Sequence, residues 1–267
     1  MPELPEVETI ARGLDRRIRG ESIASVWIGD KPQPLQSPAR EIAQQLEGAT
    51  IAEVRRVGKH IVVDLEGRGQ WIVHLGMTGK MTLHSADDAI VKHTHLIARL
   101  RSGRELRFVD ARRFGRLAVR GAGDAFAGPG REPLTIGEEE FILLFRGRRT
   151  PIKAALLNQK LLHGVGNIYA DESLFRARIR PRRQAGRLTA GELRALRLAL
   201  RRVLREAIRL GGSSVSDYVD ADGEEGFFQL RHRVYLRTGE PCLVCKTAIR
   251  RMVIAGRGTH FCPECQK

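Results

Sequence analysis

Hydrophobic positions divide the chain into a strand-rich first half and a helical second half. Val7, Ile10, Leu14 and Ile18 recur at helical spacing and predict an amphipathic helix near the N-terminus. Short alternating segments follow, separated by polar or glycine turns, and they predict strands over 22–28, 51–57, 60–65, 70–75, 80–83, 94–100, 105–109 and 116–119. Strands of this length and spacing are typical of a sandwich or barrel.

The second half has a different pattern. A segment rich in glycine, alanine and proline at 121–130 ends the strand pattern. The longest expected helix runs from about Thr189 to Leu210, because Thr189 and Glu192 make a capping-box sequence and two glycines follow Leu210. We therefore expect an α+β multidomain protein with a β-sandwich and N-terminal helix at 1–125, a linker at 126–137, a helical domain at 138–230 and a zinc-ribbon finger at 231–267.

The prediction of a zinc-ribbon finger rests on the four cysteines. All four lie in the last 26 residues as two C-x-x-C units 16 residues apart, namely Cys242, Cys245, Cys262 and Cys265. This spacing predicts the four-sulfur site of a zinc ribbon. Two disulfides are the alternative, which a reducing cytoplasm would disfavour. Because all four ligands come from the protein, one structural Zn²⁺ is expected rather than a catalytic one.

Charge indicates the kind of partner. The 267 residues carry 46 Lys+Arg against 31 Asp+Glu, a net charge of +15. Such a balance favours a polyanion, most plausibly nucleic acid, although a solvated arginine-rich surface would have the same composition. No apolar run approaches the ~20 residues of a membrane span. The opening is acidic and helical rather than a secretory signal, so a cytoplasmic location is expected.

The N-terminus carries the candidate chemistry. Removal of Met1, which a following proline usually permits, would leave Pro2 as a free secondary amine beside Glu3 and Glu6. An amine can attack an electrophilic carbon and form a Schiff base, and the iminium formed by a secondary amine is an electron sink suited to elimination. Alternatively, Pro5 and the glutamates only start a helix and complement its dipole.

A second motif lies at 161–175, which reads as helix, glycine turn, helix. Gly164 and Gly166 allow close approach of the backbone to a ligand, and the following helix start offers unpaired amides suited to phosphate. Asn167 could donate to the same phosphate, or simply cap the helix.

These motifs together closely resemble bacterial formamidopyrimidine-DNA glycosylases, which excise oxidised purines. The strongest match is Pro2-Glu-Leu-Pro-Glu-Val-Glu-Thr9, and matches continue to the last residue. The resemblance implies that Pro2 attacks the deoxyribose C1′, that Glu3 is the general acid/base and that Glu6 supports the site. It also implies a helix-two-turns-helix in which Asn167 grips phosphates flanking the lesion.

Further roles are implied by the same resemblance. Lys59 and His74 would bind phosphate beside the scissile nucleotide, and Arg257 would clamp phosphate from the zinc hairpin. An enzyme that extrudes a nucleotide needs apolar wedges and a donor for the widowed base. The segments 74–79 and 108–115 supply candidates, with Met77 and Phe114 as wedges, Arg112 as the donor to an estranged cytosine and Arg113 beside it. Taken singly, these residues could equally be core or salt-bridge positions.

Two segments bear on how closely this sequence follows the family pattern. Gly130-Arg-Glu-Pro-Leu134 departs from the family's usual Leu-Gly-Pro-Glu-Pro-Leu, which affects the linker more than the chemistry. The resemblance places the base-gripping loop at about Asp217–Gln229, and Lys153 is a candidate to approach the base there.

The resulting hypothesis is a monomeric, cytoplasmic base-excision repair enzyme acting at the nucleoid. It would remove 8-oxoguanine or formamidopyrimidines opposite cytosine in double-stranded DNA, by Schiff-base chemistry with β- and δ-elimination. Neither a membrane nor a redox cofactor is expected. One alternative is the sister glycosylase for oxidised pyrimidines. Another is a non-enzymatic zinc-ribbon protein that binds nucleic acid, for which Pro2 and Glu3 would be dispensable.

Overall fold

The described chain forms two compact units. The computed structural model describes residues 1–214, 218–221 and 223–267. One unit comprises Met1–Ala127 with Leu210–Phe227, and the other comprises Gly128–Arg209 with Phe228–Lys267. The boundary after Ala127 lies in the expected linker. Residues 210–227 differ from expectation, because they group with the first unit and not with the helical one.

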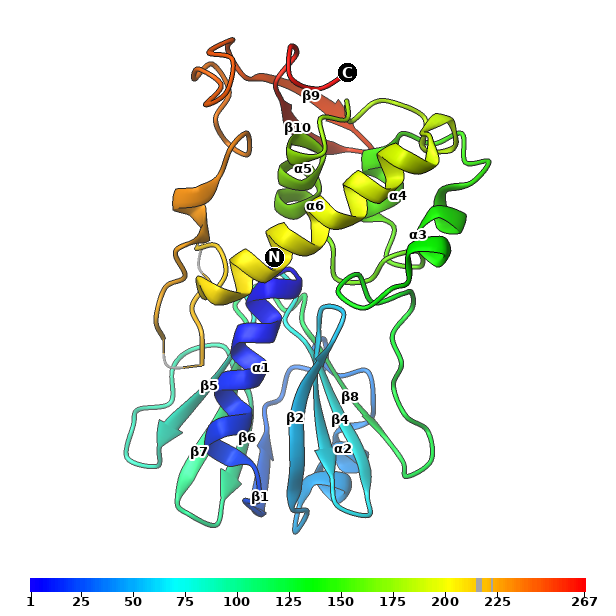
Figure 1. Cartoon of the computed structure of the whole chain (residues 1–267). Helices are drawn as coiled ribbons and strands as arrows, with labels where there is room; N and C mark the ends of the chain where they lie inside the picture. The colour runs from blue at the N-terminus through cyan, green and yellow to red at the C-terminus, as the bar shows by residue number, and fades with distance from the viewer. Residues whose placement is uncertain (215–217, 222) are drawn as a thin grey trace. The chain divides into compact units, whose positions relative to one another are not determined.

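The first unit is a sandwich of two antiparallel four-stranded sheets (Figure 1). One sheet has the order β1 (Ile23–Ile28), β6 (Thr94–Leu100), β7 (Arg104–Val109) and β5 (Lys80–Ser85). The other has the order β2 (Ile51–Val57), β3 (His60–Leu65), β4 (Gly69–His74) and β8 (Arg116–Arg120). All eight predicted strands are confirmed, with ends shifted by at most two residues.

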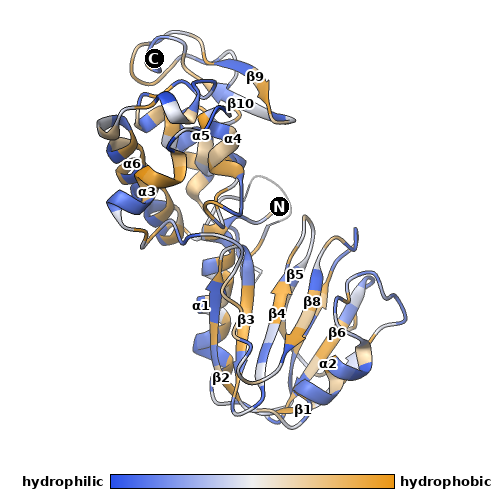
Figure 2. Ribbon diagram, turned by 90° about the vertical axis from the view of Figure 1, so that its right-hand side faces the viewer, coloured by the Kyte–Doolittle hydropathy of each residue, from blue (hydrophilic) through white to orange (hydrophobic). Residues whose placement is uncertain are grey.

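Helix α1 (Leu4–Ile18) completes the core of the sandwich. Its predicted stripe of Val7, Ile10, Leu14 and Ile18 is at most 2% exposed and belongs to one hydrophobic cluster with residues of both sheets. The strands themselves carry long hydrophobic stretches (Figure 2). Helix α2 (Ala39–Leu46) was not predicted; it is short and buries only two side chains.

A buried carboxylate fastens residues 210–227 to this unit. Glu6 Oε1 accepts the backbone N–H of Ser213 at 2.8 Å, and the Tyr218 hydroxyl donates to the Gly211 carbonyl at 2.9 Å. Gly212 has φ +87°, and a Cβ there would lie 2.9 Å from Glu6 Oε1. These contacts with α1 explain why the segment packs with the first unit although it follows the longest helix in the chain.

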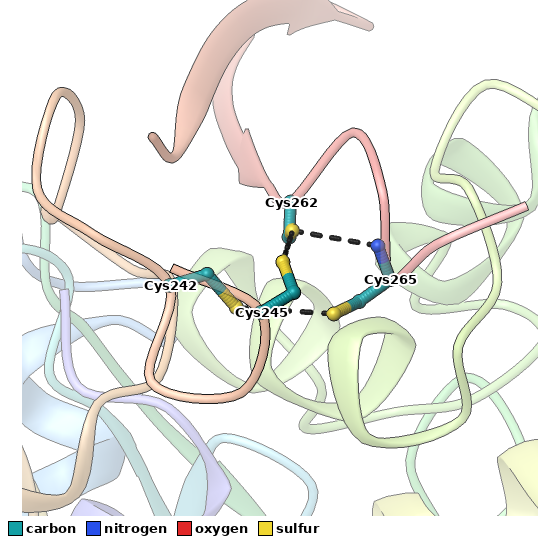
Figure 3. A group of neighbouring side chains, drawn as sticks. All are labelled: Cys242, Cys245, Cys262 and Cys265. Atoms are coloured by element: carbon teal, nitrogen blue, oxygen red, sulfur yellow. Dashed lines mark hydrogen bonds between the residues drawn. The ribbon is translucent and has the colours of Figure 1, made fainter. Parts of the chain in front are cut away.

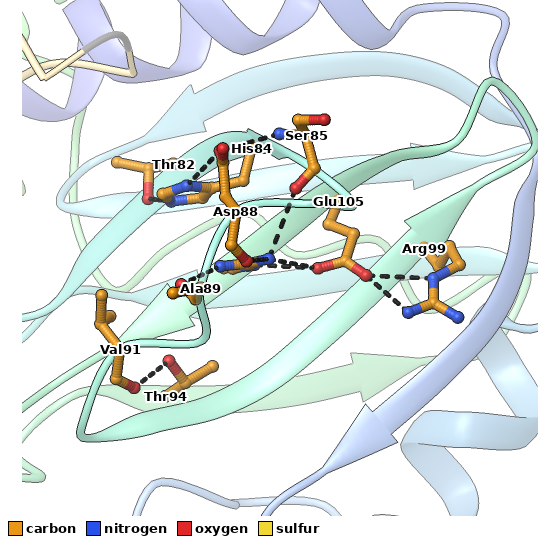
Figure 4. A network of polar contacts seen from close by, with 10 residues as sticks. Thr82, His84, Ser85, Asp88, Ala89, Val91, Thr94, Arg99 and Glu105 are labelled. Atoms are coloured by element: carbon orange, nitrogen blue, oxygen red, sulfur yellow. Dashed lines mark hydrogen bonds and ion pairs between the residues drawn. The ribbon is translucent and has the colours of Figure 1, made fainter.

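An ionic network lies in the sheet that contains β7 (Figure 4). The guanidinium of Arg107 is completely buried and donates to Glu105 Oε2 and to the carbonyls of Asp88 and Ala89. Arg99 donates to the other oxygen of Glu105 at 2.7 Å. Burial alone would raise the pKa of Glu105, but its bonds to Arg99 and Arg107 hold that pKa below its ordinary value. Arg107 therefore ties the 85–91 loop to the sheet.

The second unit is mainly helical and ends in a two-stranded ribbon. Its elements are α3 (Glu138–Phe145), α4 (Ile152–Leu157), α5 (Asn167–Arg176), α6 (Ala190–Arg209), β9 (Arg250–Ile254) and β10 (Arg257–Phe261). The capping box at α6 is confirmed, since Glu192 Oε2 accepts the Thr189 N–H at 2.8 Å and Thr189 Oγ1 accepts the Glu192 N–H at 3.2 Å. Among the described residues, no helix is both long and apolar enough to cross a membrane.

The Arg107 network gives the first prediction. Arg107→Met removes a buried charge that three polar partners require, so we expect a loss of about 3–5 kcal/mol in the free energy of unfolding. Urea denaturation followed by circular dichroism measures it. Arg101→Met, at an exposed turn position of the same sheet, should change stability by less than about 0.5 kcal/mol. Equal stability of the two variants would show that the network does not hold the loop.

Candidate functional site

The start of α1 places two glutamates beside the chain terminus. Glu3 is the N-cap residue, and its N–H donates to Glu6 Oε2 at 2.8 Å within a capping box. Glu3 and Glu6 are 5% and 2% exposed, whereas Pro2 is half-buried. The structure contains Met1, so the terminal amine lies one residue before Pro2. The predicted trio of Pro2, Glu3 and Glu6 therefore lies together.

Four charged side chains act on the terminal amine. Burial lowers the pKa of the Met1 amine; Glu3 and Glu6 raise it, while Lys59 and Arg112 lower it, and the net result is a pKa below the ordinary value. Because these groups come from the helix start, the β2–β3 turn and the β7–β8 loop, three elements converge at the terminus. A lowered pKa keeps more of an amine neutral, which is its nucleophilic form.

His74 lies at the end of β4 opposite His60 of β3, with ring centroids 4.9 Å apart. Burial, followed by the charges of His60, Lys59 and Arg116, lowers the pKa of His74 to about 4. The Gly76 N–H donates to His74 Nδ1 at 3.2 Å, so the proton of the neutral ring sits on Nε2. Near neutral pH this side chain therefore offers an uncharged donor.

Hydrogen bonds hold together the two loops that carry the predicted wedges, Met77 and Phe114, and the predicted donor, Arg112. Asp110 is fully buried; its Oδ1 accepts the Thr78 hydroxyl at 2.5 Å and its Oδ2 accepts the Gly115 N–H at 2.7 Å. Gly76 has φ +64°, and a Cβ there would lie 2.5 Å from Gly115 N. The 75–79 and 110–115 loops thus have little freedom to separate.

The side chains at the tips of these loops are exposed. Met77 and Phe114 are 44% and 48% exposed, and the Arg112 guanidinium lies 4.8 Å from the centre of the Phe114 ring. Arg113 adopts φ +55°, an uncommon conformation for an arginine, which turns the chain between Arg112 and Phe114. Sequence reasoning missed Asp110 and Thr78, although an aspartate opening a turn is a recognisable signal.

The second unit carries Asn167 and Lys153. Asn167 is the first residue of α5 and Gly166 is the N-cap, so Asn167 does not cap the helix. Its Nδ2 donates to the Gly258 carbonyl at 3.0 Å, which connects the helix start to the ribbon hairpin.

Lys153, which was predicted to approach a damaged base, lies where α4, α5 and β10 meet. Its side chain is completely buried, forms an ion pair of 2.7 Å with Asp171 and donates to the Gly258 carbonyl and the Thr259 hydroxyl. Asp171 also accepts the His260 N–H at 2.8 Å. The lysine thus holds α4, α5 and β10 together. Asp171 was missed, although it lies one helical turn after Asn167.

The base-gripping loop expected at Asp217–Gln229 falls partly outside the described residues. Asp217 and Asp222 are not described. Of the remainder, Tyr218 is 8% exposed, and burial raises its pKa well above the ordinary value.

The four predicted cysteines form one cluster (Figure 3). All four are free thiols, and their sulfur atoms lie within 4.8 Å of one another, with Cys245 and Cys262 3.4 Å apart and Cys242 and Cys265 3.9 Å apart. A tetrahedral zinc with bonds of about 2.3 Å would place its sulfurs about 3.8 Å apart, so the cluster fits one Zn²⁺ and not two disulfides.

The ribbon presents Arg257 at its tip. Ala255 and Gly256 between the two strands both have positive φ, as in the tight turn preferred by hairpins. Arg257 follows directly and is exposed. Cys262 comes immediately after β10, so a bound metal would stabilise the strand that carries Arg257.

Comparisons with known proteins agree with this architecture. Residues 1–117 match the formamidopyrimidine-DNA glycosylase N-terminal domain, 130–219 match the H2TH domain of the same enzymes, and 239–267 match the zinc finger found in FPG and IleRS. The formamidopyrimidine-DNA glycosylase of Solibacter usitatus is 47% identical and that of Gluconobacter oxydans 44% identical, each over the whole of both chains.

Solved structures are similar over the same length. A Lactococcus lactis FPG mutant in complex with Fapy-dG-containing DNA has a TM-score of 0.93 at 35% identity, covering all of both chains. The MutM (FPG) protein of Thermus thermophilus has a TM-score of 0.88 at 45% identity, covering 99% of this chain and 98% of that one.

The sandwich, the helix-two-turns-helix and the four-cysteine ribbon define a zinc-ribbon DNA glycosylase of base-excision repair. More particularly, the chain belongs to the formamidopyrimidine-DNA glycosylase family. It is therefore a glycosylase and abasic-site lyase, as its opening residues predict. The alternative of a non-enzymatic zinc-ribbon protein is wrong.

The cysteine cluster leads to a prediction about metal removal. We expect one zinc per chain by elemental analysis, and we expect chelation to unfold the ribbon and to abolish binding of an abasic-site duplex, because Arg257 loses its support. Native mass spectrometry and gel-shift titration measure these effects. Cys242→Ser should have the same effect, whereas Thr247→Ser beside the cluster should not. A zinc-free protein with full DNA affinity would contradict the expectation.

The buried His74 leads to a prediction about pH. In nitrogen-detected NMR the ring should stay neutral, protonated at Nε2, until the pH falls to about 4. Because the unfolded chain takes up this proton near pH 6.5, the stability contributed by the neutral ring is complete above that pH and declines as the pH falls to about 4.

His74→Gln should therefore weaken the pH dependence of the free energy of unfolding in that interval. His232 in the second unit, whose pKa burial also lowers to about 4, is the internal control, and its own NMR titration should be the same in the variant. Titration of His74 near pH 6.5 in the folded protein would contradict the structure.

Proposed function

We propose that the Pro2 amine, freed by removal of Met1, is the nucleophile that attacks C1′ of the damaged nucleotide. The observation that carries the proposal is the environment of the terminus. Pro2 directly precedes the buried Glu3, whose N–H donates to Glu6, and the Met1 amine one residue away feels Glu3, Glu6, Lys59 and Arg112 and has a pKa that burial lowers. Attack breaks the bond to the base and forms an iminium after the sugar ring opens. Loss of the C2′ proton then drives β-elimination, and δ-elimination follows.

Glu3 is the proton-transfer residue in this proposal. It lies at the N-cap, one residue from Pro2, and its carboxylate is almost completely shielded from solvent. It delivers a proton to the opening sugar ring. Glu6 is a positioning residue, because it binds the Glu3 N–H through one oxygen and the Ser213 N–H through the other.

The phosphates are held from both units in this proposal. In the first unit, Lys59 supplies a charge and His74 an uncharged Nε2 donor beside the scissile nucleotide. In the second unit, Asn167 and Arg257 contact the strand, and the Gly258 carbonyl that binds Asn167 lies next to Arg257. Lys153 positions these groups through its bonds to Gly258 and Thr259 rather than touching the base.

Met77, Arg112 and Phe114 fill the gap left by the extruded nucleotide. Exposed apolar side chains on loops braced by Asp110 are suited to wedging between bases. Arg112, stacked on Phe114, would hydrogen-bond the estranged cytosine, and Arg113 would contact the neighbouring backbone.

The substrate proposed is 8-oxoguanine or a formamidopyrimidine opposite cytosine, in chromosomal DNA of the cytoplasm. Lactococcus lactis FPG forms complexes with Fapy-dG-containing DNA and with abasic-site DNA, which supports this class. Another complex of Lactococcus lactis FPG contains DNA with an oxidised pyrimidine, so excision of oxidised pyrimidines is the second candidate activity. Excision rates on dihydrothymine and 8-oxoguanine duplexes separate the two.

Borohydride trapping tests the nucleophile. With an 8-oxoguanine·cytosine duplex, the reductant should yield a covalent adduct that peptide mass spectrometry assigns to Pro2, and without reductant both strand cleavages should occur. Glu3→Gln should lower the single-turnover excision rate by about 10²–10⁴-fold, the usual contribution of general acid–base catalysis. Glu8→Gln, one turn further along α1, is the matched control.

The protein must first be shown by intact mass to begin at Pro2. An adduct on a lysine instead of Pro2, or an unchanged rate for Glu3→Gln, would refute the assignment.

A further inference from the structure

A basic hollow of about 530 Å³ lies in the second unit, and none of the DNA-contacting residues assigned above lines it. It is formed where the base of the β9–β10 ribbon meets the segment after α5, and it is lined by Arg180, Arg182, Arg250, Arg251, Met252, Phe261, Pro263 and Glu264. Four of these eight residues are arginines and only one is acidic. Such a composition differs from small-molecule pockets, which are mostly apolar.

One arginine belongs to the wall of the hollow. Arg180 donates to the carbonyls of Pro263 at 2.5 Å and Gln266 at 3.2 Å, and its guanidinium lies 5.9 Å from the centre of the Phe261 ring. It holds the C-terminal segment in place.

The other three arginines are exposed and available. Within the described part of the chain, no ion pair joins Arg182, Arg250 or Arg251 to a carboxylate. The Arg251 guanidinium lies over Gly258, where a Cβ would approach it to 3.0 Å. Gathering like charges around one hollow is unfavourable in isolation, and an anion would relieve the repulsion.

We propose that this arginine hollow binds backbone phosphates of nucleic acid outside the stretch held by Arg257. Guanidinium groups match the geometry of phosphate oxygens and bind them with two parallel hydrogen bonds. Phe261 is only 7% exposed, so the hollow has no aromatic platform for a base, and recognition is independent of sequence.

The Arg250 end of the hollow is a separate contact from the hairpin tip, whereas the Arg251 guanidinium reaches back over Gly258. In the ribbon Arg257 pairs with Ile254 and Phe261 pairs with Arg250, four residue steps apart. At about 3.4 Å per residue this is about 14 Å, which corresponds to about four phosphates of one strand along a duplex axis. Phosphates bound at the two ends of the ribbon are therefore different ones.

The competing explanation is that the arginines balance the zinc site. Phe261, Pro263 and Glu264 flank the Cys262 and Cys265 ligands, and four thiolates on one Zn²⁺ leave a net negative charge. In that case removing the arginines would weaken zinc retention instead of DNA binding.

The salt dependence of binding to undamaged duplex tests the proposal without any excision chemistry, so its failure is distinct from failure of the assigned catalytic roles. The test protein is the zinc-loaded full chain carrying Arg182→Gln, Arg250→Gln and Arg251→Gln. The matched control removes three exposed arginines of α6 instead, Arg202→Gln, Arg205→Gln and Arg209→Gln. Affinity is measured by fluorescence anisotropy for duplexes of about 12 and about 36 base pairs, which span about 41 and 122 Å.

Loss of three phosphate contacts should reduce the slope of log K against log [salt] by about 2–3 for the hollow variant relative to the α6 control. If the slope falls only for the longer duplex, the hollow contacts the same duplex beyond the stretch held by Arg257. An equal reduction on both lengths, with two short duplexes bound per wild-type chain, supports a contact with a second duplex.

Equal slopes for the two variants would overturn the proposal. Zinc loss from the hollow variant, detected by native mass spectrometry, would also overturn it in favour of the zinc-balancing role. Recovery of the slope with Arg182→Lys, Arg250→Lys and Arg251→Lys would support phosphate binding, because lysines restore the charge.

Discussion

The carboxylate of Glu6 is the interaction on which the first unit's site depends. Its two oxygens accept the backbone N–H groups of Glu3 and Ser213, residues that are 210 positions apart in the chain. One bond sets the start of α1 and therefore the position of the terminal amine. The other holds the segment that returns from α6. A buried acceptor with two charge-assisted bonds is costly to leave unsatisfied, so both backbone segments are held with little freedom.

Acidic residues of α5 have the corresponding role in the second unit. Asp171 binds Lys153 and the His260 N–H, while Glu172 accepts the N–H groups of Arg233, Val234 and Tyr235. These bonds secure the segment before the ribbon and strand β10 of the ribbon to one helix. The same helix begins with Asn167, so the phosphate-contacting positions proposed for the helix start and for the hairpin are supported by one rigid element.

Burial also determines the chemical state of the site. Partial burial lowers the pKa of the Met1 amine despite the two glutamates nearby, and burial lowers the pKa of His74 to about 4. Both shifts favour the uncharged form of the group. The neutral amine keeps its lone pair, and the neutral imidazole keeps an Nε2–H donor. The positive charge of Lys59 contributes to both shifts. An electropositive, partly dry site thus suits both a neutral nucleophile and an anionic substrate.

The sequence by itself determined the strands, the α1 stripe, the α6 capping box and the zinc ligands, because each depends on short-range periodicity or spacing. It also identified the family, since the residues of the opening motif are contiguous. Only the tertiary structure revealed that Asp110 locks two loops, that Lys153 is buried against Asp171, and that residues 210–227 join the first unit. These outcomes depend on hydrogen bonds and burial that involve residues far apart in the chain. Local sequence patterns do not indicate which distant residues will be partners.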